Sequence, residues 1–72
     1  MNLQLLKSKR VLKNYTQESI AEKIGMTTKT YNRKELGVTP FTINDVVLLT
    51  ILLELNLVEI NQIFFDNNLP IV

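Results

Sequence analysis

Residues 17–35, which read QESIAEKIGMTTKTYNRKE, decide how this chain folds. Gly25 divides the stretch, because a residue just past a helix end often needs a positive φ angle, which glycine tolerates best. Thr27 can cap a second helix that runs from about Thr28 to Glu35. Two helices joined by only three or four residues cross steeply, and the small Ala21 permits the close approach. The apolar residues that give the first helix its inward face are Ile20, Ala21 and Ile24.

The flanking sequence predicts three more helices. Asn14 can take the left-handed conformation that ends a helix, and Thr42 with Asp45 fits a capping box in which Asp replaces the usual Glu. The expected helices cover residues 2–13, Ile43 to Leu53–Leu55, and Leu57–Phe64. Strand-like alternation is conceivable only at 70–72. We therefore expect an all-α fold, a compact bundle of five short helices, with one domain over 1–65 and a tail over 66–72.

Composition excludes several classes of function. The 72 residues include no cysteine and no histidine, which excludes disulfides, cysteine nucleophiles, Cys/His zinc sites and histidine acid–base catalysis. There is no glycine-rich phosphate loop, and the carboxylates are scattered over different helices. We therefore expect no enzyme, cofactor, metal or small-molecule substrate. The apolar run 46–53 is too short to span a bilayer, so a soluble cytoplasmic protein is expected.

Charge is unevenly distributed along the chain. Residues 1–40 hold all eight cations against three glutamates, a net charge of +5, whereas residues 41–72 hold four acidic residues and no cation, a net charge of −4. This asymmetry favours one face that meets an anion. A solvated basic surface without a partner is the equal alternative.

Five segments, in this order and spacing, resemble the phage repressor and Cro family, also called XRE-like. The segments are Leu6–Val11, Thr16–Thr27, Tyr31–Glu35 followed by Gly37, Phe41–Thr42 and Ile63–Phe65. The resemblance covers about residues 3–65. It implies a λ-repressor-like helix-turn-helix domain (helix-turn-helix at 17–35) whose third helix enters the major groove. It further implies a transcriptional regulator in a bacterial or phage-infected cell that binds a palindromic operator in double-stranded DNA as a homodimer.

The resemblance assigns base recognition to the outward face of the third helix. Lys29 and Arg33 can donate to guanine O6 and N7, and Asn32 can pair with adenine. Thr28 can hydrogen-bond or touch a thymine methyl group. The alternative is a solvated helix face without a partner.

Phosphate contacts are expected nearby. In the family the glutamine that matches Gln17 contacts the DNA backbone at a helix start, where free N–H groups attract phosphate. The matching arginine and glutamate form an ion pair in related repressors, so Arg10 is expected to pair with Glu35 and also to face a phosphate. The weaker phosphate candidates are Lys7, Lys9, Lys34 and Thr39.

Three departures from the family stand out. Lys34 occupies a position that is often aliphatic, and Tyr31 replaces an aliphatic residue, which suggests a partly buried ring with its hydroxyl toward DNA.

The third departure is the fourth helix, which is apolar on nearly every side. Its core candidates are Val46, Val47, Leu49, Leu52 and Leu53, and a further stripe, the expected homodimer interface, is Leu48, Ile51 and Leu55. The alternative to a dimer interface is an ordinary core with scattered surface leucines. The second functional hypothesis is a protein-interaction module on the same fold, such as an antirepressor or antitoxin-type adaptor.

Overall fold

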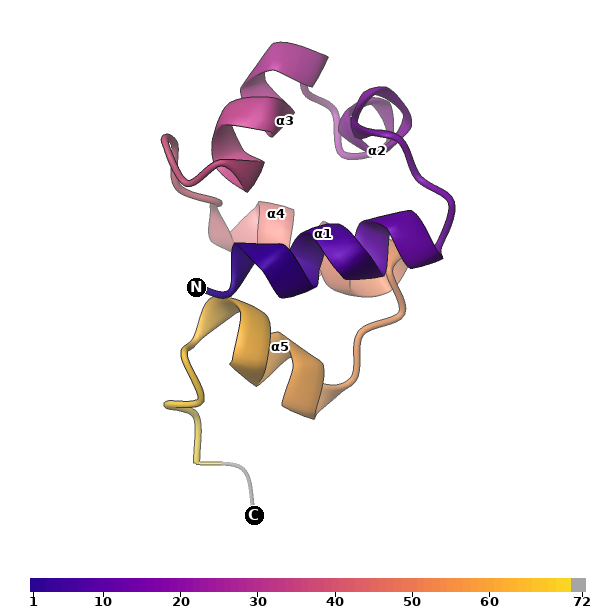
Figure 1. Cartoon of the computed structure of the whole chain (residues 1–72). Coiled ribbons are helices and arrows are strands. Elements are labelled where there is room, and N and C mark those ends of the chain that lie inside the picture. Colours follow the sequence, from indigo (N-terminus) through magenta and orange to yellow (C-terminus); the bar gives the residue numbers. More distant parts are fainter. Residues whose placement is uncertain (71–72) are drawn as a thin grey trace.

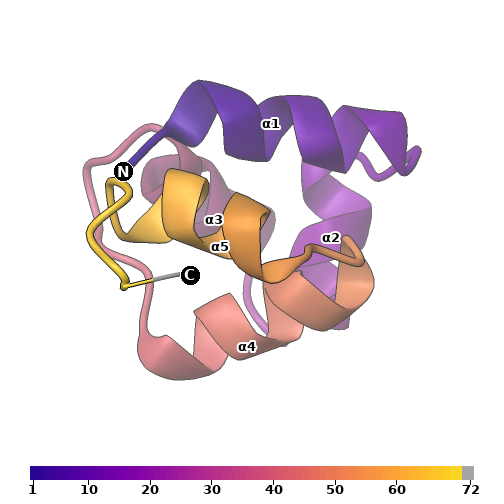
Figure 2. The same ribbon diagram turned by 90° about the horizontal axis from the view of Figure 1, so that it is seen from below.

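The computed structural model describes residues 1–70, which form five α-helices and no strand, as the all-α prediction requires. The helices are α1 (Leu3–Leu12), α2 (Gln17–Lys23), α3 (Thr28–Glu35), α4 (Ile43–Leu52) and α5 (Leu57–Phe64). Helix α1 crosses the middle of the molecule, with α2 and α3 on one side of it and α5 on the other (Figure 1). Seen from below, α1 and α4 lie at opposite edges of the molecule, and α5 lies nearer the viewer, in front of the space between them (Figure 2). The possible strand at 70–72 falls largely outside the described residues.

Every helix starts at a polar N-cap whose side chain accepts a backbone N–H three residues further on, which satisfies one of the free donors of the first turn. The caps are Asn2, Thr16, Thr27, Thr42 and Asn56. In the expected Thr42–Asp45 box, Asp45 N–H donates to Thr42 Oγ1 at 3.1 Å and Thr42 N–H donates to Asp45 Oδ2 at 3.0 Å. These local signals fix where α2, α3 and α4 begin, and hence the orientation of α3.

Left-handed residues end the helices. Asn14 and Gly25 have φ angles of 64° and 79°, as their positions predict. Gly37 has a φ of 83°, which strains any other residue, and an added Cβ would lie 3.2 Å from Leu3 Cδ1 of α1, a tight contact. Helix α4 ends earlier than the expected Leu53–Leu55 boundary, because Glu54 takes a φ of 52° and turns the chain.

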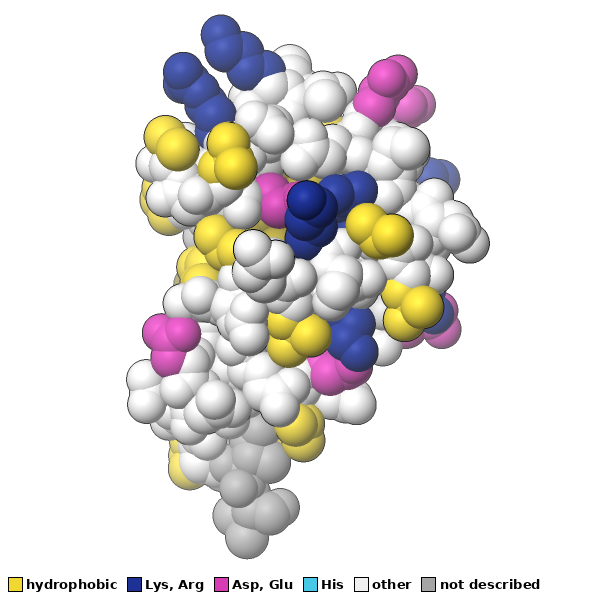
Figure 3. Space-filling model, viewed as in Figure 1, with side chains coloured by type: hydrophobic (Ala, Val, Ile, Leu, Met, Phe, Trp, Pro, Cys, Tyr) yellow, Lys and Arg dark blue, Asp and Glu magenta, His cyan; other side chains and the backbone are white. Residues whose placement is uncertain are grey.

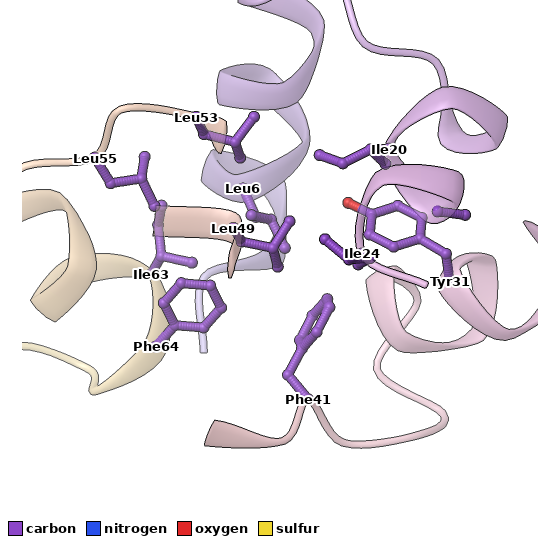
Figure 4. Packing of buried hydrophobic residues seen from close by; sticks show 11 residues of the cluster. Leu6, Ile20, Ile24, Tyr31, Phe41, Leu49, Leu53, Leu55, Ile63 and Phe64 are labelled. Atoms are coloured by element: carbon purple, nitrogen blue, oxygen red, sulfur yellow. The ribbon is translucent and has the colours of Figure 1, made fainter. Parts of the chain in front are cut away.

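One core joins all five helices (Figure 4). Leu6 and Leu49 are fully buried at its centre. The ring of Phe41, in the loop before α4, meets Tyr31 edge-on at 6.3 Å between ring centroids and Phe64 edge-on at 5.9 Å, which links α3 to α5. The other buried apolar residues are Ile20, Ala21, Ile24, Leu53, Leu55 and Ile63.

Packing corrects three expectations about apolar residues. Tyr31 is fully buried and its hydroxyl points into the core, not toward DNA (Figure 4). Val47 is half exposed and lies outside the core. Leu55 is buried, because the turn at Glu54 directs the following residue inward.

The first residues of the expected tail fold back on α5. Asp66 and Asn67 both have positive φ angles. The buried side chain of Asn61 accepts the N–H of Leu69 at 2.9 Å and donates to its carbonyl at 3.3 Å. Among residues 1–70, no helix has the length and apolar character needed to cross a membrane.

Candidate nucleic-acid interface

Helix α3 is divided lengthwise into an open face and a buried face. Thr28, Lys29 and Arg33 are exposed, and Lys29 and Arg33 lie one helical turn apart on the same side. The opposite side packs against the rest of the protein through Tyr31, Lys34 and Glu35. Long cationic side chains project from the α3 end of the molecule (Figure 3). The helix therefore presents hydrogen-bond donors and positive charge to solvent while its other side is held in place.

The two oppositely charged halves of the sequence largely neutralise each other in the fold. Each acidic residue of the second half forms an ion pair with a cation of the first half or with the terminal amine. The pairs are Lys34–Asp45, Lys13–Glu54, Lys9–Glu59 and the amino group of Met1 with Asp66. Residues 41–70 therefore present no acidic side chain without an ion pair.

Four cations have no ion pair among residues 1–70: two lie on α3, one on α1 and one on α2. They are Lys7, Lys23, Lys29 and Arg33. Acidic side chains gather beside α2 (Figure 3), where Glu18 and Glu22 form no ion pair in the described chain. The free positive charge therefore lies on α3, in the middle of α1 and at the end of α2.

Arg10 and Glu35 form the ion pair expected from the resemblance. Arg10 Nε and Nη2 donate to the two carboxylate oxygens of Glu35, each at 3.0 Å, in a bidentate contact. Arg10 Nη1 donates to the Tyr15 carbonyl at 2.7 Å. Burial opposes ionisation of Glu35, but the hydrogen bonds from Arg10 hold its pKa below the usual value. Because its guanidinium is buried and occupied, Arg10 is not positioned for the predicted phosphate contact.

A chain of hydrogen bonds continues from this pair to the protein surface. Gln17 Nε2 donates to Glu35 Oε1 at 3.4 Å, and Asn32 Nδ2 donates to Gln17 Oε1 at 3.0 Å. Gln17 and Asn32 are half-buried and line an open hollow of about 360 Å³ together with Lys7. Asn32, predicted to read a base together with Lys29 and Arg33, is therefore hydrogen-bonded to α2, whereas Lys29 and Arg33 are exposed.

A helix-turn-helix family model matches residues 6–60, more than half of the chain. The chain belongs to the XRE-like helix-turn-helix family. No curated protein and no solved structure matches it significantly. The repressor and Cro resemblance is thus confirmed at the level of the family, and the protein is a DNA-binding helix-turn-helix protein.

Two weaker phosphate candidates have other partners in this helix-turn-helix domain. Lys34 is buried, and its ammonium donates to Asp45 Oδ2 because the last turn of α3 packs against the start of α4. Burial opposes ionisation of Asp45, yet the hydrogen bonds from Lys34 and Thr42 keep its pKa below the usual value. Lys9 pairs with Glu59 of α5. The buried Lys34 is not free to meet a phosphate, and the partly exposed Lys9 would first have to leave Glu59, whereas Lys7 is exposed and Thr39 half-buried.

The stripe expected as the dimer interface does not exist as one surface. Leu55 is buried, Leu48 is half-buried against the core, and only Ile51 is well exposed. The exposed apolar side chains of α4 are instead Ile43, Val47 and Ile51, each four residues apart. This spacing could have been found in the sequence, but assigning Val47 to the core concealed it.

Proposed function

We propose that this helix-turn-helix protein is a sequence-specific transcriptional regulator of the phage or prophage Cro or repressor kind. The observation that carries the proposal is the pair Lys29 and Arg33, exposed one turn apart on α3 and free of ion pairs among the described residues. A helix of eight residues is about 12 Å long, which matches the width of the major groove, about 12 Å.

The open face of α3 has the chemistry that base recognition needs. Lys29 and Arg33 supply donors for guanine O6 and N7, and Thr28, at the start of the helix, supplies a hydroxyl and a methyl group. Gln17 and Lys7, beside the hollow, are suited to the sugar–phosphate backbone, which fixes register without reading sequence. This separates the contacts that specify a site from those that only strengthen binding.

Selection of binding sites from a random duplex pool tests the proposal. We expect enrichment of a palindrome whose half-sites lie about 34 Å apart, one helical turn, because a symmetric dimer presents two copies of α3. Recovery of an asymmetric single site would contradict the dimer, and recovery of no preferred sequence would contradict sequence-specific regulation.

The dimer is expected to use the exposed α4 residues Val47 and Ile51. Replacing both with lysine would place charges in an apolar contact and separate the copies. Sedimentation of wild type and of the Val47→Lys, Ile51→Lys variant measures this, with Lys7→Ala as a surface control. A variant with the wild-type mass would show that this surface does not join two copies.

The exposed apolar side of α4 also favours a second candidate, a protein-interaction module on the same fold. Binding measured at two salt concentrations distinguishes the two functions. DNA binding releases counterions, so its affinity falls steeply, with a logarithmic slope of about −0.9 for each phosphate neutralised. An apolar protein contact has no such dependence.

A further inference from the structure

We propose that Asn32 is a positioning residue for DNA binding: it holds the carboxamide of Gln17 in one orientation and does not itself read a base. The inference rests on the proposed function and concerns how the α2 side of the interface is organised. Its basis is the continuous set of hydrogen bonds that runs from Arg10 through Glu35 and Gln17 to Asn32.

The chemistry of the groups fixes the direction of every bond in this set. Arg10 only donates, so the Glu35 carboxylate stays ionised beside it and only accepts. The atom of Gln17 that faces Glu35 must therefore be its amide nitrogen, which places Gln17 Oε1 toward Asn32. Since Gln17 Oε1 only accepts, Asn32 must present its amide nitrogen to that oxygen. No other assignment of the two amides satisfies the buried carboxylate.

This orientation leaves Gln17 ready to donate. One of its two N–H groups faces Glu35, and the second has no partner among the described residues. Gln17 borders the hollow that Lys7 also lines, so a donor and a cation lie at the same surface. A backbone phosphate accepts from such groups. Without Asn32 the amide would be held only by its long bond to Glu35, 3.4 Å, so binding would have to restrict it further each time.

The same bond limits what Asn32 can do with a base. An asparagine that recognises adenine uses both its oxygen and its amide nitrogen. Here one of its two N–H groups is engaged with Gln17 at 3.0 Å, and the side chain is half-buried beside α2, so it is less accessible to a base edge than the exposed side chains of Lys29 and Arg33. Specificity is therefore expected to come from Thr28, Lys29 and Arg33.

A double-mutant cycle on DNA tests the proposal. The variants Asn32→Ala, Gln17→Ala and the combination are measured on the selected operator and on a duplex with its core scrambled. We expect Asn32→Ala to weaken both duplexes by the same factor, roughly three- to tenfold for one hydrogen bond. The double variant should lose much less than the product of the two single losses, because both act through one amide. Arg33→Ala is the matched control, since it should change the ratio between the duplexes.

Two results together would make Asn32 a base reader: Asn32→Ala changes the base preference at one operator position, and the affinity losses of the two single variants multiply in the double variant. They would overturn this inference but leave the proposed function standing. A wild-type protein that selects no sequence would overturn the proposed function instead. A measurement without DNA separates these cases: in Asn32→Ala the side-chain N–H protons of Gln17 should exchange faster with water by NMR. Unchanged exchange would show that Asn32 does not hold Gln17.

Discussion

Arg33 and Lys34 are neighbours in sequence and carry the same charge, but they lie in two different environments. Arg33 is exposed on the open face of α3 and has no ion pair in residues 1–70. Lys34 is buried and bound to Asp45. One residue around the helix is a rotation of about 100°, enough to move a cation from solvent to the α4 interface. The position of a charge on the helix, not its presence, decides whether it serves binding or packing.

The buried face of α3 is held by two ion pairs that begin at consecutive residues. Lys34 joins α3 to α4, and Glu35 joins α3 to α1. Both lie in the last turn of the helix, whereas Thr28 and Lys29 lie in the first. The helix is thus held along its buried face, with two ion pairs in its last turn, while its other face stays open, which suits an element that must enter a groove without tilting.

The largest expected effect comes from breaking the pair between Arg10 and Glu35. Glu35→Ala leaves a buried guanidinium without its partner, and such losses cost about 3–5 kcal/mol. Urea unfolding measures the change. The control is the double variant Arg10→Met, Glu35→Leu, which removes both charges and should be more stable than Glu35→Ala. If Glu35→Ala unfolds at the wild-type urea concentration, the pair does not support α3.

Acid should weaken the same contact. The pKa of Glu35 is lowered in the folded protein, so its contribution is fully present above the unfolded value, about 4.3, and is lost as the pH falls through the folded pKa. Asp45 follows the same rule. Wild type should therefore lose stability at acidic pH, and Glu35→Ala should lose less over the same range.

The second pair should cost less to break. Lys34→Met leaves Asp45 with the N–H of Thr42 as a partner, so we expect a loss of about 1–3 kcal/mol. Asp45→Ala should cost about 1 kcal/mol more, because it also removes half of the capping box that starts α4. Urea unfolding of Lys34→Met and Asp45→Ala shows which variant loses more stability. Equal losses would mean that the cap adds nothing beyond the ion pair.

For DNA affinity and base preference, substitution of Arg33 should matter more than substitution of Lys34. Arg33→Ala is expected to cost about 1–3 kcal/mol on the operator and to relax preference at one base pair. Lys34→Met should leave base preference unchanged, since its ammonium faces Asp45 and not solvent. Gel shifts on operator and scrambled duplex compare the two variants. A wild-type ratio for Arg33→Ala would show that the open face of α3 does not read sequence.

The sequence predicted local features better than long-range ones. The caps at Thr27 and Thr42 and the turns at Asn14 and Gly25 depend on neighbouring residues, and all are present. The residues next to Lys34 do not indicate that it pairs with Asp45, which lies eleven residues away on another helix. The burial of Lys34 was therefore not predicted.

Charge could not be assigned to surfaces for the same reason. Counting cations and acids along the chain predicted separated charges, but Lys9 and Lys13 meet Glu59 and Glu54 across the fold. The Arg10–Glu35 pair was expected only because the family resemblance supplied it. Long-range pairing therefore needed either a relative or the structure.

The smallest expected effect concerns the exposed pair between Lys13 and Glu54, which contrasts with the buried pairs of α3. Hydrogen bonding from Lys13 lowers the pKa of Glu54, but the pair is open to solvent and screened by salt. Glu54→Gln should therefore leave the midpoint of urea unfolding unchanged. Glu54→Gly, by contrast, should raise it slightly, because residue 54 has a φ of 52° and glycine adopts this conformation without a Cβ clash. Equal destabilisation by Glu54→Gln and by Glu54→Gly would show that the charge, and not the backbone conformation, matters at this turn. Burial would then no longer distinguish the ion pairs that stabilise this chain from those that do not.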